Sequence, residues 1–238
     1  MASIHKRPDG RKFNELRKII AKVGVVPNAD GSAMFAFGDT VAIAAVYGPR
    51  KLHPQHLQNP KTGILRCNYD LLSFSVYERK KPGPSRRSKE ISKVTEWALL
   101  PAVYLENFPG TVVDVEIYIL QADAGTRTAG INAASMALAH AGIPMKDLIC
   151  SVAAGKNDKQ LILDLSKEEE DYHEGEGATD FAIAKLANSD EITLMQMDGK
   201  IQPGLVPELI NLVNESSKEI YEAQKKALKS AVEGGENE

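Results

Sequence analysis

One segment of this 238-residue chain places a hydroxyl and a guanidinium where a strand gives way to a helix. Residues 122–127 read ADAGTR, and the helix is predicted to begin near Thr126. A turn of this kind directs backbone N–H groups and the positive end of the helix dipole at one point, which favours an anion. Thr126 can cap the helix or donate its hydroxyl to that anion, and Arg127 adds a charge. Taken alone, the segment is more typical of an ordinary helix cap with a surface arginine.

A second segment, between positions 78 and 93, is strongly basic. It holds seven Lys or Arg and two Glu, about +5 in a chain whose formal net charge is −3. Its Pro and Gly residues predict a loop, and the helix after it is predicted to open near Ser88, so Arg86 and Arg87 lie at the positive end of the dipole. Cations are unfavourable there unless an anion is shared, and a guanidinium matches a phosphodiester. A solvated charged loop explains the charge equally well.

A third segment, residues 164–180, carries eight carboxylates in 17 residues. Most side chains of such a loop are expected to be simply solvated. Asp180, however, directly precedes an apolar strand, and a carboxylate at a strand end is held in a defined direction. Two or three such oxygens could hold Mg²⁺, which prefers carboxylate, water and phosphate ligands.

Composition excludes several classes of protein. The near-balanced charge excludes a bulk polycation, so any affinity for nucleic acid must come from a local patch. Two cysteines, Cys67 and Cys150, exclude a disulfide scaffold and fit a reducing compartment. No apolar run approaches the roughly 20 residues of a membrane span, and the first residues are too polar for a secretory signal. These features predict a soluble cytoplasmic protein that does not contact a membrane.

Hydrophobic periodicity predicts an α+β fold in which strands and then helices occur twice. The whole chain is predicted to be one domain with halves near 1–145 and 146–232 and a flexible tail at 233–238. One helix is predicted over 88–108, with a kink at Pro101, and an Ala/Gly/Ser-rich buried helix over 126–141. A long amphipathic helix is predicted over 203–232. The predicted strands are 19–26, 32–37, 40–47, 64–76, 111–121, 148–155, 160–165, 181–186 and 192–197.

These segments together resemble the RNase PH superfamily, and within it the catalytic RNase PH-type subunits of archaeal exosomes. The matching stretches follow the family order over essentially the whole chain; they are 7–11 (RPDGR), 84–87 (PSRR), 120–127 (LQADAGTR), 141–145 (AGIPM) and 162–165 (ILDL). Each stretch is weak alone, but together and at these spacings they are specific. The resemblance implies an RNase PH-like fold with mixed sheets and helices packed on them.

The resemblance also implies roles for particular residues. The Gly-Thr-Arg turn would bind inorganic phosphate through Gly125, Thr126 and Arg127, and the paired arginines Arg86 and Arg87 would bind the RNA backbone. Acidic residues after the Leu-Asp-Leu strand would supply the catalytic carboxylates and the ligands of Mg²⁺ or Mn²⁺.

This chain departs from the family in that acidic loop. Relatives usually place two Asp residues six positions apart, whereas Asp171 and Asp180 are nine positions apart here. Glu174 has the six-residue spacing to Asp180. The catalytic and metal-binding candidates are therefore Asp180 with either Asp171 or Glu174.

The activity that the resemblance implies is processive 3′→5′ phosphorolysis of single-stranded RNA, which releases nucleoside diphosphates. It further implies a hexameric ring in which three copies alternate with a related non-catalytic subunit, together with RNA-binding cap subunits. Two alternatives stay open: a non-catalytic RNA-binding ring subunit, and a metal-dependent hydrolytic 3′→5′ exoribonuclease. The product distinguishes the enzymes, because hydrolysis releases nucleoside monophosphates.

Overall fold

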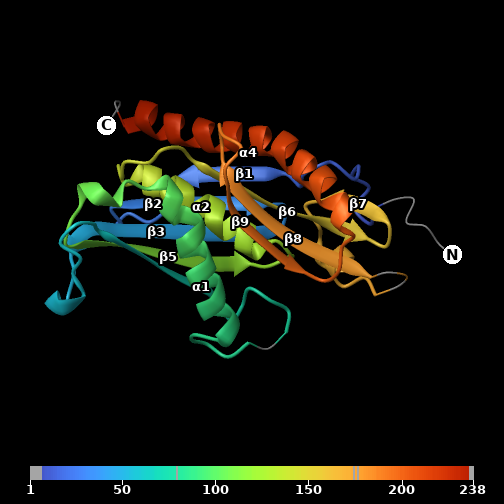
Figure 1. Cartoon of the computed structure of the whole chain (residues 1–238), viewed down its shortest axis with the longest axis horizontal. Helices are drawn as coiled ribbons and strands as arrows, with labels where there is room; N and C mark the ends of the chain where they lie inside the picture. The colour runs from blue at the N-terminus through green and yellow to red at the C-terminus, as the bar shows by residue number, and fades with distance from the viewer. Residues whose placement is uncertain (1–6, 79, 174, 176, 236–238) are drawn as a thin grey trace.

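Two β-sheets with helices packed between and around them form the chain (Figure 1). The computed structural model describes residues 7–235 except 79, 174 and 176. In spatial order, the five-stranded sheet contains β1 (Ile19–Val23), β2 (Gly31–Phe37), β3 (Thr40–Lys51), β5 (Thr111–Gln121) and β4 (Ile64–Leu71). The four-stranded sheet contains β7 (Gln160–Leu163), β6 (Ile149–Asn157), β8 (Ala178–Leu186) and β9 (Ile192–Asp198). The predicted α+β class is confirmed.

The order of the strands places two loops at one edge of the five-stranded sheet. β4 and β5 are parallel neighbours, with Leu71 opposite Ile119 near their carboxyl ends. The loop after β4 and the turn after β5 therefore leave the sheet side by side, and the backbone N–H of Ala122 donates to the carbonyl of Ser75 at 2.9 Å. The basic segment and the Gly-Thr-Arg turn are thus brought together by strand pairing.

Helix α2 (Thr126–His140) is the buried centre of the fold. It contacts β2 and β3 of one sheet and β6 and β8 of the other, and most of its side chains are Ala, Gly, Ser or Thr. A Cβ at Gly130 would lie 3.2 Å from Ile117 of β5, so only a small residue fits at this crossing. The small-residue helix predicted from composition is confirmed.

The other long helices cover the outside of this core (Figure 1). α4 (Val206–Gly235) contacts β1 and β6 and buries Leu209, Val213 and Ile220 at helical spacing. It continues to Gly235, so it includes the start of the segment predicted to be a flexible tail; residues 236–238 lie outside the described part. α1 (Arg86–Leu99) contacts β4 and β9.

The prediction of a single kinked helix over 88–108 was wrong at both ends. Ser85 caps α1 by accepting a hydrogen bond from the backbone N–H of Ser88, so the helix begins at Arg86. α1 ends at Leu99, and Pro101 lies in a separate 3₁₀ turn, Leu100–Ala102, instead of kinking a continuous helix.

Both cysteines lie in the core. Cys67 and Cys150 are buried free thiols, and burial raises the pKa of both, that of Cys150 to about 12, which disfavours the reactive thiolate. Within the part of the chain that the structure describes, none of the helices is both long and apolar enough to cross a membrane.

Candidate functional site

The Gly-Thr-Arg turn has a backbone conformation that leaves the first turn of α2 open to a ligand. Ala124 and Gly125 are both left-handed, with φ of 53° and 62°, and Gly125 is the N-cap residue without a side-chain cap. Thr126 is the first residue of the helix, so the alternative in which it caps the helix was wrong. The first N–H groups of an α-helix have no partner within the helix and are available to an anion.

A buried tyrosine orients the hydroxyl of Thr126. The Tyr69 hydroxyl donates to Thr126 Oγ1 at 2.9 Å, and both residues are buried. Burial raises the pKa of Tyr69 to about 12, so this phenol stays protonated. Because Thr126 accepts from Tyr69, its own proton is free to point toward a ligand at the helix start.

Arg127 and Asp180 approach the same space from the two halves of the chain. Arg127 lies in the first turn of α2, and Asp180 lies in β8, where it pairs with Gly155 on one side and Asp198 on the other. Arg127 Nε and Asp180 Oδ1 are both buried and without a hydrogen-bond partner among the described residues. Unpaired buried polar atoms are uncommon in folded proteins and are typical of a site that a ligand completes.

The environment of Asp180 favours the protonated form of its carboxyl group. Its pKa is raised to about 6, first by burial and then by the charges of Glu170 and Asp198, while Arg127 and Arg87 act in the opposite direction. Arg127 is therefore within Coulombic range of Asp180, although no ion pair connects them in the described part of the chain. A carboxyl group with such a pKa can donate a proton near neutral pH.

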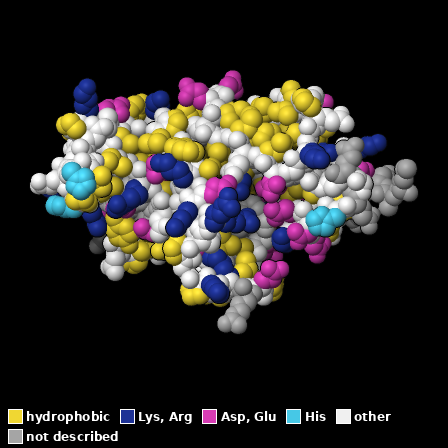
Figure 2. Space-filling model, turned by 60° about the horizontal axis from the view of Figure 1, so that its bottom comes forward, with side chains coloured by type: hydrophobic (Ala, Val, Ile, Leu, Met, Phe, Trp, Pro, Cys, Tyr) yellow, Lys and Arg dark blue, Asp and Glu magenta, His cyan; other side chains and the backbone are white. Residues whose placement is uncertain are grey.

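Arg86 and Arg87 lie at the positive end of the α1 dipole, as predicted, but they are the first two residues of the helix and do not precede it; both are exposed. Arg87 acts to lower the pKa of Asp180, so its charge lies within Coulombic range of that carboxyl group. Elsewhere in the basic segment, Lys80 is paired with Asp70 at 2.7 Å, and Arg79 lies outside the described residues. Figure 2 shows Lys and Arg side chains gathered near the middle of one face, with Asp and Glu side chains beside them.

Of the two candidates for the second carboxylate, Asp171 and Glu174, only Asp171 lies within the described residues. Asp171 is exposed and forms an ion pair with Lys167 at 2.7 Å, and it is not among the largest influences on Asp180. Glu174 lies outside the described residues. The acids that do act on Asp180, Glu170 and Asp198, were missed by the sequence analysis. Asp198 could be found only from the register that sets it opposite Asp180 across β8 and β9.

The donors around Asp180 fit Mg²⁺ or Mn²⁺ shared with a substrate and do not form a complete protein cage. Directly paired residues of neighbouring strands project to the same face of a sheet, so Asp198 can add a second carboxylate beside the unpaired Oδ1 of Asp180. The described residues contain no group of three or more His, Cys, Asp or Glu that could hold a metal. Mg²⁺ commonly binds through one or two carboxylates plus substrate phosphates.

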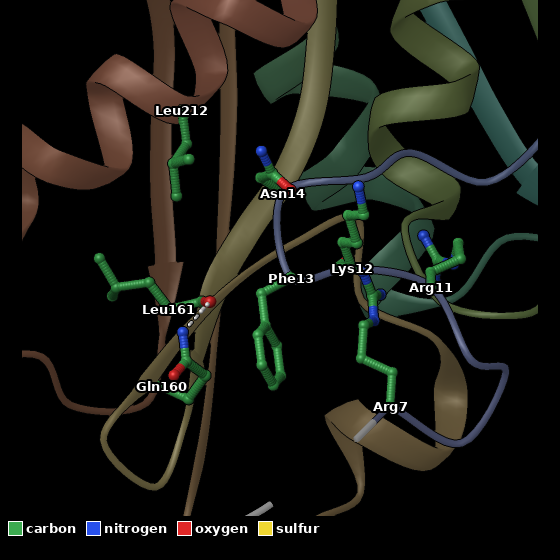
Figure 3. Close-up of a pocket in the computed structure, with 8 residues that line it drawn as sticks. All are labelled: Arg7, Arg11, Lys12, Phe13, Asn14, Gln160, Leu161 and Leu212. Carbon is green, nitrogen blue, oxygen red and sulfur yellow. Dashed lines mark hydrogen bonds between the residues drawn. The ribbon is translucent and has the colours of Figure 1, made fainter. Parts of the chain in front are cut away.

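A cavity of about 470 Å³ lies on a different part of the molecule, between the N-terminal segment, β7 and α4 (Figure 3). Arg7, Arg11 and Lys12 line it together with Phe13 and Leu212. Arg7 and Arg11 already bind carboxylates, so two of the three cations are not free to take an anion there.

Comparison with known proteins agrees with this geometry. A family model described as the 3′ exoribonuclease family (RNase PH), domain 1, matches residues 15–144, and the model of its domain 2 matches residues 147–213. The chain is 54% identical over 224 residues to the exosome complex component Rrp41 of Thermococcus gammatolerans, covering 94% of this chain and 88% of the relative. It is 47% identical over 229 residues to the Rrp41 component of Cenarchaeum symbiosum, covering 96% of this chain and 93% of the relative.

Solved structures show the same fold. The crystal structure of rice (Oryza sativa) Rrp46 superposes with a TM-score of 0.81 at 25% identity and covers 93% of this chain and 100% of the rice chain. A chain of the Archaeoglobus fulgidus exosome, solved with RNA bound to the active site, superposes with a TM-score of 0.77 at 25% identity and covers 92% of each chain. The RNase PH-like fold expected from the sequence is confirmed.

Proposed function

This chain belongs to the RNase PH family of 3′ exoribonucleases, and from that premise we propose that it is the phosphorolytic subunit of an archaeal-type exosome. It is a 3′→5′ exoribonuclease, and its close relatives are named as exosome components. The observation that carries the assignment of the site is the pair of buried, unpartnered atoms on Arg127 and Asp180 beside the open start of α2.

In this proposal the Gly-Thr-Arg turn binds inorganic phosphate, the co-substrate. The N–H groups at the start of α2, the Thr126 hydroxyl and the Arg127 guanidinium converge on one anion. Phosphate is a dianion that must approach an anionic phosphodiester, so positive charge has to be in place first. Arg127 and the helix dipole supply it in a partly desolvated site, where electrostatic interactions are stronger than in water.

Asp180 is the proposed general acid. An oxygen of the bound phosphate forms a bond to the terminal phosphorus while the bond from that phosphorus to the 3′-oxygen breaks. The proton of Asp180 passes to the leaving 3′-oxygen, so the products are a nucleoside diphosphate and an RNA shorter by one nucleotide. A pKa of about 6 keeps part of the Asp180 population protonated near neutral pH.

Arg86 and Arg87 hold the RNA in line for this attack. Both guanidiniums extend from the first turn of α1, and Arg87 lies near Asp180, so they can bind phosphates next to the scissile one. Contacts to the backbone carry no base information, and sequence-independent degradation of single strands follows. In the alternative role of Asp180, its deprotonated carboxylate would hold a Mg²⁺ or Mn²⁺ ion together with Asp198, and that ion would supply charge neutralisation at the phosphoryl oxygens.

The proposed assembly is a hexameric ring that alternates this chain with a related non-catalytic subunit and carries RNA-binding caps. Its support is the exosome names of the relatives and the RNA-bound exosome among the similar structures. We place this activity in the cytoplasm, consistent with the two buried free thiols.

The product of the reaction tests this function against both alternatives. The purified chain and its related ring subunit are incubated with labelled single-stranded RNA and Mg²⁺, with and without inorganic phosphate. Nucleoside diphosphates that form only with phosphate are the expected result. Nucleoside monophosphates formed without phosphate would identify a hydrolase and leave Thr126 and Arg127 without a role. RNA binding without any release would identify a non-catalytic ring subunit.

A further inference from the structure

A second arginine, Arg17, lies just before β1 and holds an aspartate of the opposite half. Its guanidinium donates to both carboxylate oxygens of Asp164, from Nη2 to Oδ1 at 2.7 Å and from Nε to Oδ2 at 3.0 Å. The backbone N–H of Arg17 donates to the same Oδ2 at 2.7 Å. Burial by itself would lower the pKa of Arg17, but Asp164 and then Asp123 raise it overall, so the charge is retained in the interior.

Asp164 is itself a fixed point of the second half. It follows β7, is 1% exposed, has a left-handed φ of 52° and donates its N–H to Ala153 of β6 at 2.7 Å. Its backbone carbonyl accepts from Arg7 at 2.8 Å and from Arg11 at 3.1 Å. Because Asp164 is held by several contacts, its carboxylate has a fixed position and can fix the position of Arg17, which binds it.

The remaining nitrogen of Arg17 reaches the phosphate-binding turn. Nη1 donates to the carbonyl and to the carboxylate of Asp123, two residues before Gly125. Thr40 joins the same contact: its hydroxyl lies 2.8 Å from the Asp123 carbonyl and 2.6 Å from that of Ala124, and it accepts from the Asp123 N–H at 3.0 Å. A Cβ added at Gly125 would lie 3.3 Å from Arg17 Nη2, so the guanidinium packs directly beneath the turn.

The acidic loop is tied to the same point. The other carboxylate oxygen of Asp123 accepts from the backbone N–H of Lys167, the first residue of α3 (Lys167–Glu170). α3 carries Glu170, which acts on Asp180, and Glu169, which binds Arg7 through two hydrogen bonds of 2.7 and 2.8 Å. One hydrogen-bond network, buried at Arg17 and Asp164 and partly exposed at Asp123 and Lys167, therefore connects the turn of the first half with the acidic segment of the second.

We propose that Arg17, through Asp164, is a positioning residue that sets the phosphate-binding turn against the Asp180 side of the site. The inference rests on the proposed function, because it assigns to Arg17 the placement of the turn that binds phosphate. The two consecutive left-handed residues of that turn, Ala124 and Gly125, are an unusual backbone that must be held by its surroundings. Arg17 and Thr40 hold it at the two carbonyls that precede the helix.

The test compares Arg17→Met and Arg17→Lys with the unaltered protein, each in the assembly with the related ring subunit. Rates are measured against phosphate concentration at saturating RNA and against RNA concentration at saturating phosphate. We expect Arg17→Met to raise the KM for phosphate at least roughly tenfold and the KM for RNA less than twofold. Arg17→Lys keeps the charge beside Asp164 but cannot also reach Asp123. Its KM for phosphate should therefore lie between that of the unaltered protein and that of Arg17→Met.

Arg50→Met is the matched control. Arg50 forms an exposed ion pair with Asp30 at 3.3 Å, at the far end of the strand that Thr40 begins. It should leave both KM values unchanged.

Removing one member of a buried ion pair destabilises a fold strongly, so a second variant leaves Arg17 intact. Thr40→Val deletes only the hydroxyl that binds the turn, and it should raise the KM for phosphate several-fold with kcat per folded molecule reduced less. Unchanged phosphate KM in both Thr40→Val and Arg17→Lys, with the unaltered enzyme dependent on phosphate, overturns the positioning role alone. An unaltered enzyme that ignores phosphate overturns the proposed function and this inference with it.

Discussion

Two combinations of an arginine from one half and an aspartate from the other differ in one respect. Arg17 and Asp164 are joined by three hydrogen bonds, counting the one from the Arg17 backbone, and both are almost fully buried. Arg127 and Asp180 also come from opposite halves, yet each keeps a buried polar atom without a partner in the described structure. The first combination has its hydrogen bonds made within the protein, whereas the second leaves two atoms that the phosphate and RNA of the proposed reaction would contact.

We interpret the difference as one of role: the Arg17–Asp164 pair fixes the geometry of the fold, and Arg127 and Asp180 form the proposed site. A buried pair with all its hydrogen bonds made contributes rigidity and a fixed geometry. Buried charged groups without partners cost stability, and proteins retain them at sites where a substrate supplies the missing interactions. Asp123 joins Arg17 to the turn that precedes Arg127 and to the start of α3, so the Arg17–Asp164 pair can hold that turn in place.

Asp180→Asn should show the largest difference between the two combinations, because it should lower activity without lowering stability. The acid is lost, so kcat should fall at least roughly 10²-fold. Stability should change in the favourable direction: the folded-state pKa of about 6 lies above the ordinary value of 3.8, so the wild type loses stability as the pH rises through this interval. Asn carries no charge, and the variant should be more stable than the wild type at pH 8 by about 2 kcal/mol, with little difference at pH 4.

Denaturant unfolding at pH 4 and pH 8 measures this effect, and Asp190→Asn serves as the control because Asp190 is fully exposed. An Asp180→Asn variant that retains normal turnover would remove Asp180 from the mechanism. A variant equally destabilised at both pH values would mean that Asp180 is a paired structural carboxylate like Asp164.

The Arg86→Ala, Arg87→Ala double variant tests whether the exposed cations of α1 bind phosphates. Each phosphate contact to a single strand contributes about 0.7 to the slope of log affinity against log salt, so the slope should flatten by up to about 1.4. Binding of labelled RNA at several salt concentrations gives the slope. Lys225→Ala, Lys226→Ala changes the net charge equally on α4 and should leave the slope as it is. An unchanged slope in the arginine variant would reduce these residues to a solvated surface.

Tyr69→Phe should have the smallest effect. It removes the hydroxyl that donates to Thr126, and a neutral hydrogen bond of this kind contributes about 1 kcal/mol, so the KM for phosphate should rise roughly fivefold. In a Thr126→Val background the same change should have no further effect, because the partner is absent. Tyr221→Phe on α4 is the matched control. Additive effects of the two substitutions would show that Tyr69 does not act through Thr126.

Local pattern was sufficient for much of the fold. The strand predicted over 111–121 has those bounds in the structure, because Val113, Val115, Ile117 and Ile119 alternate with polar residues and are buried. The start of α1 was misplaced because Ser85 and Ser88 form a reciprocal cap, and either serine alone could begin a helix. The turn at Gly125 was recognised from its small residues and the helix after it.

The site was only partly predictable, for a physical reason. Their positions beside a helix start and a strand made Arg127 and Asp180 candidates, and the resemblance to the RNase PH superfamily supplied their expected roles. Asp198 and Tyr69 act through strand register and the packing of α2, which no local pattern encodes. Arg17 has no sequence signal either, since a charged residue before a strand is expected on the surface, and it becomes buried only when Asp164 is folded against it.

The central claim is that Arg127 binds one phosphate at the start of α2, next to Asp180, and direct binding tests it. Equilibrium dialysis with radiolabelled phosphate at pH 8, with divalent ions chelated, compares the assembled wild type with its Arg127→Met and Asp180→Asn variants. We predict at least tenfold weaker binding for Arg127→Met, and binding as tight as the wild type or tighter for Asp180→Asn, because the anion then meets no carboxylate. Equal affinity of wild type and Arg127→Met would contradict the account.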